Sequence, residues 1–377
     1  HKLTMLPDEV VQVYTLMAGR DCPAVSLYVT LNEDTLEVTG SETRLDRVPI
    51  AANLRHDQLD GVITEATLTG AAPADYEFAA ELAFAHRLAR HLKAAREVVR
   101  GKPENFNRPD YNFRLDGNEG EPNGDETVRI SERKRGAPLD LIVSEAMILA
   151  NCHWGGFIAD HGVPGIYRSQ ASMAPGIKVR MGTKPAPHAG MGVPQYTWAT
   201  SPLRRYVDLV NQWQIIACAR HGRTAALAAP FKPKDATLFS VISSFDGAYS
   251  AYNGFQSGIE RYWALRWIEQ QGLTELDASV MKDGLVRSDH LPLVFRALGT
   301  ENLPRHAHVR VRITGIDLLT LDLHASLAAR LDDQPAPEDS TDADPEGEGD
   351  EPSAGVLTLA IDLADTPDSA ATTAAAG

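Results

Sequence analysis

The sequence predicts an α+β protein in which a mixed helix-and-strand unit is followed by a small all-β barrel of the OB type. Helical periodicity and strand-like alternation are interleaved in residues 1–272. Short alternating segments separated by Gly- and Pro-marked turns follow in residues 273–330. Residues 331–377 are acidic and rich in Pro and Gly, so we expect a mostly disordered tail with one strand-like segment at 356–363.

The net charge of −15 is unevenly distributed along the 377 residues. Residues 331–377 hold 13 of the 51 acidic residues and none of the 36 Lys and Arg residues. The rest of the chain is therefore nearly neutral, and the acidic overall pI does not exclude a basic channel for nucleic acid.

Membrane, zinc and ATP-dependent functions find no support in the sequence. No apolar run approaches a membrane span and no signal peptide is evident, so we expect a cytoplasmic protein. Cys22, Cys152 and Cys218 form no C-x-x-C pair and are expected to be reduced thiols. The chain has no H-E-x-x-H and no G-x-x-x-x-G-K-[ST] motif, and nothing in it indicates an obligate protein partner.

The first part of the chain predicts one helix and three strands. A helical pattern covers Asp8–Ala18, and Ala24–Leu31 alternates apolar and polar side chains as a half-buried strand does. A turn then leads into a second strand through Leu36 and Val38, and Arg47–Ile50 is a candidate third strand.

The clearest helix begins at an Asp75 cap and ends at Gly101. One of its faces is basic, and we interpret this face as solvated rather than as a nucleic-acid contact. Residues 116–126 are polar and turn-rich, which predicts a hairpin tip. The basic face consists of Arg87, Arg90, His91, Lys93, Arg96 and Arg100.

Two further helices and the barrel strands follow from periodicity. Pro138 opens a helix that ends before Gly162, with Val143 and Met147 among its inward positions. A later helix is predicted from Phe255 to Gln271, with its apolar side chains facing the core. The barrel strands are expected at Ser279–Leu285, Leu291–Ala297, His308–Thr314 and Leu318–Leu323. The barrel rim would carry Arg305, His306, His308, Arg310 and Arg312.

The segment Tyr196–Leu209 predicts a loop that turns into a helix. Thr200 or Ser201 can cap the free N–H groups, and Pro202 fits the first helical position. The helix would then run to about His221, where a glycine stops it.

Arg204 and Arg205 fall in the first turn of this predicted helix, where positive side chains oppose the helix dipole. Guanidinium groups that converge with free N–H groups make a phosphate site, which we favour. The alternative is that Arg204 merely pairs with Asp208, one turn further along the helix.

Several segments, in this order along the chain, resemble the catalytic domain of the ribonuclease II family. The resemblance covers about residues 1–270, and ordered matches are far more specific than one short motif. The matching segments are Met5–Pro7, Phe106–Tyr111, Leu141–Asn151, Pro187–Gly190 and Thr200–Tyr206 together with Asp208.

The resemblance implies a 3′→5′ exoribonuclease that hydrolyses single-stranded RNA to nucleoside 5′-monophosphates. It also implies a divalent metal, expected to be Mg²⁺, that activates the attacking water. The metal-binding aspartates of the family precede the Met5–Pro7 landmark, so we expect the ligands upstream of His1 and assign none in this chain. The alternative function is a catalytically inactive RNA-binding scaffold of the same fold.

The resemblance also assigns roles at the reacting phosphate. Arg204 takes the position of the arginine that neutralises charge growing on the phosphate. Glu260 matches a functional glutamate, and its alternative is a surface glutamate paired with a neighbouring arginine. Phe106 matches an aromatic that stacks on the terminal bases, while a core phenylalanine explains it equally well.

Further residues are predicted to contact RNA. His56 and Ser144 fall where relatives read the ribose 2′-OH with a tyrosine and a glutamate, so sugar discrimination is expected to be weaker here. His188 would face the channel or, alternatively, pack within its loop. The remaining candidates around the predicted phosphate site are Thr200, Ser201, Arg205 and Tyr206.

Overall fold

The computed structural model describes residues 6–55, 59–104, 110–117, 126–133, 136–174 and 176–332. The helices are α1 (Asp8–Tyr14), α3 (Glu65–Leu68), α4 (Ala79–Arg100), α5 (Pro138–Asp160), α6 (Tyr206–His221), α7 (Ala225–Ala228) and α8 (Ala236–Gln271), with a 3-10 turn η1 (Gly222–Thr224). The strands are β1 (Asp21–Leu31), β2 (Val38–Pro49), β3 (Asp110–Asp116), β4 (Thr127–Arg133), β5 (Tyr167–Ser169), β6 (Arg180–Gly182), β7 (Glu275–Val280), β8 (Leu285–Ser288), β9 (Val294–Leu298), β10 (His308–Asp317) and β11 (Asp322–Arg330).

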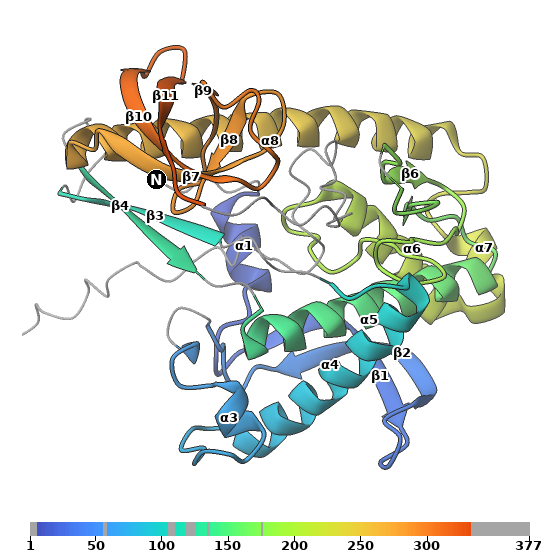
Figure 1. Ribbon diagram of the computed structural model, residues 1–377. Helices are drawn as coiled ribbons and strands as arrows, with labels where there is room; N and C mark the ends of the chain where they lie inside the picture. Colours follow the sequence, from blue (N-terminus) through green and yellow to red (C-terminus); the bar gives the residue numbers. More distant parts are fainter. Residues whose placement is uncertain are drawn as a thin grey trace, which may run out of the picture.

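The long helix α8 joins the mixed unit to the barrel (Figure 1). It has 36 residues and is therefore about 54 Å long. Leu238 near its first turn packs with residues of α6, whereas Ala264, Leu265 and Ile268 near its end belong to the barrel core. The two predicted units thus share one helix, and the stretch of α8 that carries Tyr252, Gln256 and Glu260 lies between the two cores.

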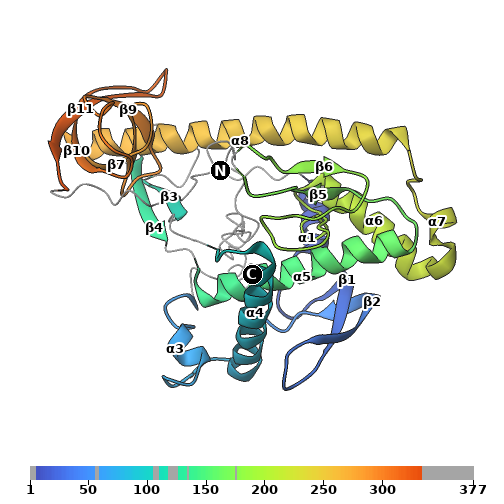
Figure 2. The ribbon, with the colours of Figure 1, turned by 45° about the vertical axis from the view of Figure 1, so that its right-hand side comes forward.

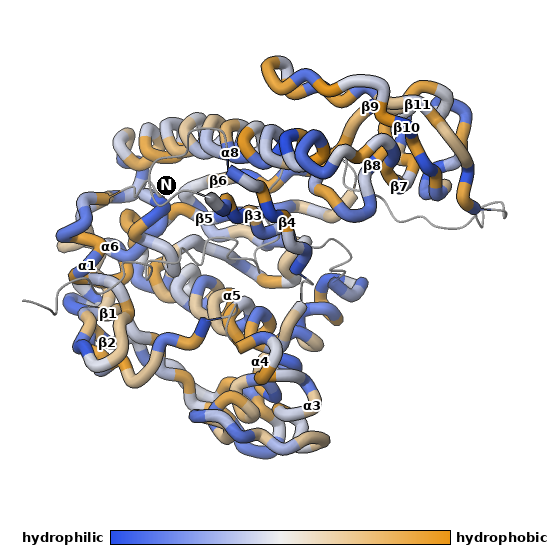
Figure 3. The backbone as a smooth tube through the Cα atoms, turned by 90° about the vertical axis from the view of Figure 1, so that its left-hand side faces the viewer, coloured by the Kyte–Doolittle hydropathy of each residue, from blue (hydrophilic) through white to orange (hydrophobic). Residues whose placement is uncertain are grey.

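The prediction for α8 is correct at its end but wrong at its start and in its buried face. The helix begins 19 residues before Phe255, at Ala236, where the Asp235 side chain caps it by accepting from the Thr237 N–H at 2.8 Å. Phe255 is 69% exposed and Ile259 is 42% exposed, although both were expected inside. Figure 3 shows hydrophilic and hydrophobic residues alternating along the length of α8. The sequence pattern therefore does not reveal a single apolar face.

The helix α5 is central to the larger unit, between α4 and α6 (Figure 2). The sequence places Val143 and Met147 inward, whereas the structure buries Ser144 and Ile148, one position later on each turn. Polar contacts cause the difference, because α5 also buries Glu145 against α4. Apolar periodicity does not reveal a face that is buried through polar partners.

By length and composition alone, α5 is a helix that could cross a membrane, contrary to the expectation that no run reaches this length. This is weak evidence, because core helices pass the same test. The buried Glu145 and Asn151 on α5 both have protein partners. These contacts are typical of a core helix.

The two strands expected after β1 form one continuous strand, β2. β1 and β2 pair in an antiparallel hairpin from Asp21↔Pro49 to Leu31↔Val38. Val25 and Leu27 of β1 pack against a core cluster that includes Trp154 of α5, and the Trp154 indole donates to the Thr43 hydroxyl at 3.2 Å. The hairpin therefore covers one side of α5.

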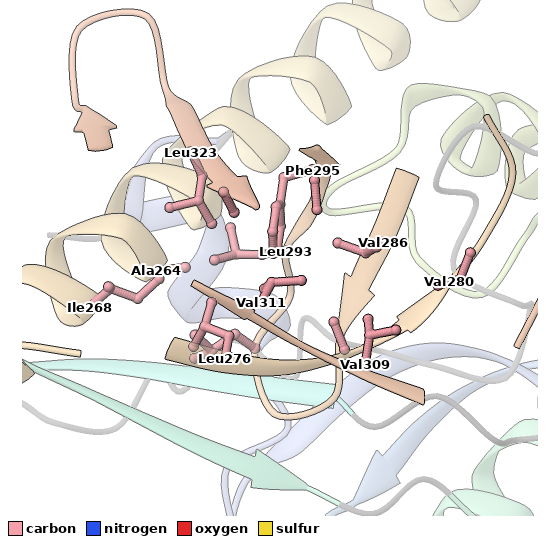
Figure 4. Close-up of a cluster of buried hydrophobic side chains, with 14 of the residues drawn as sticks. Ala264, Ile268, Leu276, Val280, Val286, Leu293, Phe295, Val309, Val311 and Leu323 are labelled. Carbon is pink, nitrogen blue, oxygen red and sulfur yellow. The ribbon is translucent and has the colours of Figure 1, made fainter. Parts of the chain in front are cut away.

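The C-terminal strands form a closed barrel in the order β10-β11-β9-β8-β7, as the sequence predicts for an OB-like unit. Val286, Leu293, Phe295, Val309 and Val311 point into its core (Figure 4). Two predicted strands are wrong in their bounds: Ser279–Leu285 spans the turn between β7 and β8, and Leu318–Leu323 consists mostly of the turn between β10 and β11.

The hairpin of β3 and β4 lies against the barrel, a contact that the sequence does not predict. Phe113 and Ile130 pack against the barrel core. The Gln270 side chain of α8 accepts from the Val128 N–H at 2.9 Å and donates to the Glu126 carbonyl at 2.7 Å. The predicted hairpin is confirmed by the β3–β4 pairing, and most of its tip lies outside the described residues.

Candidate active site

The loop from Tyr196 to Arg205 is fixed by asparagines of two helices. Asn151 of α5 donates to the Tyr196 hydroxyl at 3.3 Å and to the Thr200 hydroxyl at 3.4 Å, and it accepts from the Ala199 N–H at 3.0 Å. Asn211 of α6 donates to the Trp198 carbonyl at 2.8 Å. The loop is therefore held at several points along its length.

The helix after this loop starts later than predicted. α6 begins at Tyr206 with Arg205 as its N-cap, so Pro202 and Arg204 lie in the preceding turn. Neither Thr200 nor Ser201 caps the helix through its side chain. The Asp208 carboxylate accepts from the Ser201 N–H at 2.8 Å, so a carboxylate of the first helical turn binds the loop backbone.

Arg205 is held by Asp208 and Trp198. Its guanidinium donates to both Asp208 carboxylate oxygens, at 2.8 and 2.7 Å, and Asp208 is fully buried. The Arg205 guanidinium carbon also lies 4.1 Å from the Trp198 ring centroid, and that of Arg168 lies 3.7 Å from the same ring. The predicted alternative of a pair with Asp208 is therefore realised by Arg205, not by Arg204.

Arg204 has no such partner. Within the described part of the chain, no carboxylate lies within 4.0 Å of its guanidinium, and its half-buried side chain lies close to Tyr249 and Tyr252 of α8. Burial and the neighbouring Arg205 lower the pKa of Arg204, because both disfavour its positive charge. An anion that bound here would relieve this penalty, so the geometry fits a phosphate.

Glu260 lies on α8, in the stretch between the two cores. Its carboxylate accepts from the Gln256 side-chain amide at 3.0 Å. The adjacent arginine, Arg261, donates instead to the Val294 carbonyl of the barrel at 2.8 Å. The alternative of a simple pair with that neighbouring arginine is therefore not realised.

Tyr252 and Gln256 are connected to Glu260 by hydrogen bonds, although no motif in the sequence points to them. The Tyr252 hydroxyl donates to the Gln256 carbonyl at 2.8 Å. The spacing of Tyr252, Gln256 and Glu260 is the i, i+4 spacing of one helix face, which was a signal available in the sequence.

The other residues that are predicted to contact RNA differ in their exposure to solvent. Tyr206 is 48% exposed at the start of α6, and its ring packs on Trp213. Ser144 is buried on α5 and donates to the Leu141 carbonyl at 3.1 Å. His56 and Phe106 lie outside the described residues.

His188 is buried inside its loop rather than exposed to a channel. Its Nδ1 accepts from the Met191 N–H at 3.2 Å, and its ring packs edge-on against Tyr196. Burial, with a smaller contribution from Arg168, lowers the pKa of His188 to about 4, so the ring is neutral at pH 7. This geometry corresponds to the loop-packing alternative.

The same loop approaches α4 closely at Gly192. A Cβ there would lie 2.4 Å from the Arg96 carbonyl oxygen, so only glycine allows this approach.

The basic residues predicted elsewhere are largely paired with acids. On α4, Arg96 is buried and bonded to Glu145 and Glu104. On the barrel, Arg310 binds both oxygens of Asp277, at 2.7 and 2.9 Å, and Arg312 donates to Glu275. His308 pairs with Asp289. These surfaces are therefore less cationic than the sequence indicates.

The described residues do not fit a divalent metal centre. Across the ranges that the structure describes, there is no group of three or more His, Cys, Asp or Glu side chains that could hold an ion. The Asp208 and Glu260 carboxylates already have protein partners, which are Arg205 and Gln256. The described residues thus offer a cation and hydrogen-bonding groups for a phosphate, and no metal site is found among them.

Comparisons with known proteins agree with this architecture. The sequence model of the RNB domain matches residues 1–179 and 177–221. An uncharacterized ribonuclease of Synechocystis is 30% identical over 204 residues, which are 48% of this chain and 29% of that protein. The chain thus spans less than a third of this relative.

Two solved structures share the fold. Mycoplasma genitalium RNase R in complex with ribose-methylated single-stranded RNA superposes with a TM-score of 0.68 at 11% identity, covering 86% of this chain and 61% of that one. Yeast Ssd1, described as a pseudonuclease, superposes with a TM-score of 0.51 at 13% identity, covering 83% and 44%. At such identities the likeness concerns the fold alone, and the fold occurs in a nuclease and in a pseudonuclease.

Proposed function

Because the chain belongs to the RNB domain family, we propose that it carries the phosphate-binding side of the active site of a 3′→5′ exoribonuclease acting on single-stranded RNA. The products would be nucleoside 5′-monophosphates. The observation that carries the proposal is Arg204, a half-buried cation without a carboxylate partner in the described part of the chain, beside a loop held by α5 and α6.

The chemistry is an in-line attack of water on the terminal phosphodiester, with release of the 3′-oxygen of the preceding nucleotide. Negative charge grows on the non-bridging phosphate oxygens as the reaction proceeds. The Arg204 guanidinium is placed to neutralise this charge, a contribution typically worth ~3 kcal/mol or a few hundredfold in rate. Arg205 cannot take this role without breaking its pair with the buried Asp208.

Glu260 would order water and hydrogen-bond donors on the α8 side of the phosphate. RNB exoribonucleases generally use a divalent metal, and Mg²⁺ remains our prediction for this protein. The described residues do not fit such an ion, so we derive no step through it. The cytoplasmic location and the absence of an obligate protein partner also remain predictions.

The second candidate function is RNA binding without catalysis. The similarity in fold to a pseudonuclease supports it. An inactive relative would retain Arg204 as a phosphate contact, which makes affinity alone a poor discriminator.

The test is product formation from a 3′-labelled single-stranded oligoribonucleotide, using the protein at its natural length, with added Mg²⁺ and with EDTA. Metal-dependent release of labelled nucleoside 5′-monophosphate is expected. Binding without release under every metal condition would overturn the nuclease proposal in favour of the RNA-binding alternative.

A second preparation, verified by mass as residues 1–377, tests RNA binding and RNA hydrolysis by these residues alone. We expect it to bind the oligoribonucleotide without metal-dependent hydrolysis, because the described residues contain no metal-binding group. Strong Mg²⁺-stimulated hydrolysis by this preparation would show that we have overlooked a metal site in the chain.

A further inference from the structure

A pocket lies between α3 and α4, two helices that pack side by side (Figure 2). Its volume is about 520 Å³, and pockets that bind small molecules typically measure roughly 300–1,000 Å³. Leu68 of α3 and Ala83 of α4 line it and also belong to a hydrophobic cluster with the buried Leu82. The packed cluster therefore fixes the shape of the pocket on that side. None of the described residues that line it belongs to the candidate active site.

The polar and aromatic side chains of the pocket come from one face of α4. Phe84 and Arg87 are three residues apart, and His86 and Arg90 are four residues apart, so each pair shares a helix face. The Arg87 guanidinium carbon lies 5.4 Å from the Phe84 ring centroid. The sequence analysis interpreted the basic face of α4 as solvated, whereas the structure places two of its arginines at a pocket.

The pocket is cationic. Its described lining includes two arginines and no acidic side chain. Arg87 has no carboxylate within 4.0 Å in the part of the chain that the structure describes. Arg90 pairs with Glu65 at 3.4 Å, but the two side chains are 58% and 68% exposed, and pairs that are so exposed contribute little. Both guanidinium groups are therefore available to a phosphate.

His86 gives the pocket a neutral polar group. The residue is 4% exposed, and its ring nitrogens have no hydrogen-bond partner among the described residues. Burial, with a smaller contribution from Arg90, lowers the pKa of His86, so the ring is neutral at pH 7. A neutral imidazole offers one donor and one acceptor. A ligand with a polar edge would satisfy these buried groups.

A nucleotide combines the three features that these side chains match: a flat aromatic base, a polar base edge and a phosphate. Phe84 is 42% exposed and offers a ring on which a base of any sequence can stack. We propose that the pocket between α3 and α4 binds a nucleotide, with its base on Phe84 and His86 and its phosphate on Arg87 and Arg90. The nucleotide is either a free nucleoside monophosphate or one unit of an RNA strand, because the recognised groups are the same.

The first test compares adenosine 5′-monophosphate (AMP) with adenosine, by calorimetric titration of the natural-length protein. All variants are made in the Arg204→Ala background, so that the proposed phosphate contact of the active site does not contribute. AMP should bind about tenfold more tightly than adenosine, the usual worth of a hydrogen bond to a charged group. Arg87→Ala should remove most of this difference by weakening AMP binding while adenosine binding stays unchanged.

The ratio of the two affinities separates a phosphate contact from a merely structural effect, since a distorted pocket would lose both ligands equally. Arg220→Ala, at an exposed arginine of α6, is the matched control and should change neither affinity. Equal losses of AMP and adenosine binding in a folded Arg87→Ala variant would overturn the assignment of the phosphate to this arginine.

The base side of the pocket predicts the opposite pattern. Phe84→Leu keeps an apolar side chain and removes the aromatic ring, so it should weaken AMP and adenosine alike, by about fivefold. His86→Phe keeps a ring and removes its nitrogens, and it should also weaken both ligands. Neither variant should change the ratio of the two affinities. Wild-type affinity for both ligands in folded Phe84→Leu and His86→Phe variants would contradict binding of a base here.

A labelled single-stranded oligoribonucleotide distinguishes the two sources of the nucleotide. If the pocket takes one unit of a strand, Arg87→Ala should weaken binding and reduce the slope of log affinity against log salt by about 0.7. If it takes a free monophosphate, Arg87→Ala should lose AMP binding while RNA affinity and slope stay as they were. Unchanged binding of both AMP and RNA in Arg87→Ala would overturn the proposal.

Failure of this proposal is distinct from failure of the proposed nuclease function. The pocket is formed by residues of α3 and α4, so AMP binding tests it even if the protein hydrolyses no RNA. If the protein is a nuclease and the pocket binds no nucleotide, Arg204→Ala lowers turnover while Arg87→Ala behaves like Arg220→Ala.

Discussion

Arg205 and Asp208 form a two-point ion pair, with 2.8 and 2.7 Å between the guanidinium nitrogens and the carboxylate oxygens. This pair assigns different roles to the two neighbouring arginines. Arg205 is fixed in the interior by a fully buried carboxylate, whereas Arg204 has no carboxylate within ion-pair distance among the described residues. Stability should therefore depend on the pair, and catalysis on Arg204.

Asp208→Asn should destabilise the protein by about 3–5 kcal/mol, because it leaves the largely buried Arg205 without its counter-charge. The free energy of unfolding from urea denaturation measures this. Glu42→Gln is the matched control, since it breaks a pair with Arg44 whose side chains are 59% and 48% exposed. The control should change stability little. Equal stability of Asp208→Asn and wild type would contradict a structural role for the pair.

Arg204→Ala should lower turnover a few hundredfold while changing RNA affinity less than tenfold, because the cation is needed most when charge grows on the phosphate. Arg204→Lys should rescue turnover only partly, since lysine lacks the planar guanidinium. Arg220→Ala, at an exposed arginine of α6, is the control. Turnover is compared under saturating oligoribonucleotide, and unchanged turnover in Arg204→Ala would refute the assignment.

The lowered pKa of the buried His188 predicts that the stability of the folded protein decreases as the pH falls. Its pKa is about 4 in the folded protein and about 6.5 when unfolded, so the unfolded state binds this proton first as the pH falls. Stability should therefore decrease from about pH 6.5 down to about pH 4, with His188 contributing about 3 kcal/mol to the loss.

His188→Asn should reduce this pH dependence, because Asn keeps an acceptor for the Met191 N–H but does not titrate. Unfolding free energies at pH 7, 5.5 and 4 provide the comparison. His221→Asn, at an exposed position, is the control. If the His188→Asn curve runs parallel to that of wild type, burial of a neutral His188 is not what makes stability fall with pH.

The sequence predicted the barrel because its strands alternate buried and exposed side chains. In β10, which begins at the predicted His308, Val309 and Val311 are buried and lie two residues apart. Such alternation depends on one strand and its two faces, so it is readable locally. The hairpin of β3 and β4 was likewise readable from its polar, turn-rich tip.

The start of α6 could not be read locally. Pro202 and the hydroxyls before it have the composition of a helix start, but Asp208 binds the Ser201 N–H from seven residues away. Likewise, the first half of α8 contains Gly247 and Gly254 and packs only part of its surface, so it lacks a strong apolar period. In both cases contacts between distant residues decide the structure.

The last prediction concerns discrimination between ribose and deoxyribose. It depends on whether Glu145 could supply the carboxylate that Ser144 lacks. The resemblance to the ribonuclease II family places Ser144 where relatives carry a carboxylate, a placement that stays a prediction, and the adjacent Glu145 is the nearest candidate substitute in the sequence. Glu145 is 1% exposed and accepts from the Arg96 Nε at 2.9 Å, so it is committed to α4. The Ser144 hydroxyl itself donates to the Leu141 carbonyl. Neither residue supplies a carboxylate to a ribose 2′-OH.

We therefore expect weaker rejection of deoxyribose near the RNA 3′ end than the family pattern gives, since bonds to a carboxylate are roughly twice as strong as neutral ones. Ser144→Glu combined with His56→Tyr should restore rejection. Ser144→Gln with His56→Tyr matches the size of the side chain without its charge, and it should restore less. Degradation of RNA is compared with that of oligomers carrying one 2′-deoxynucleotide near the 3′ end, for the natural-length protein and both double variants. Equal sensitivity in all three proteins would refute the idea, as would a wild type that already stops sharply at a single deoxynucleotide.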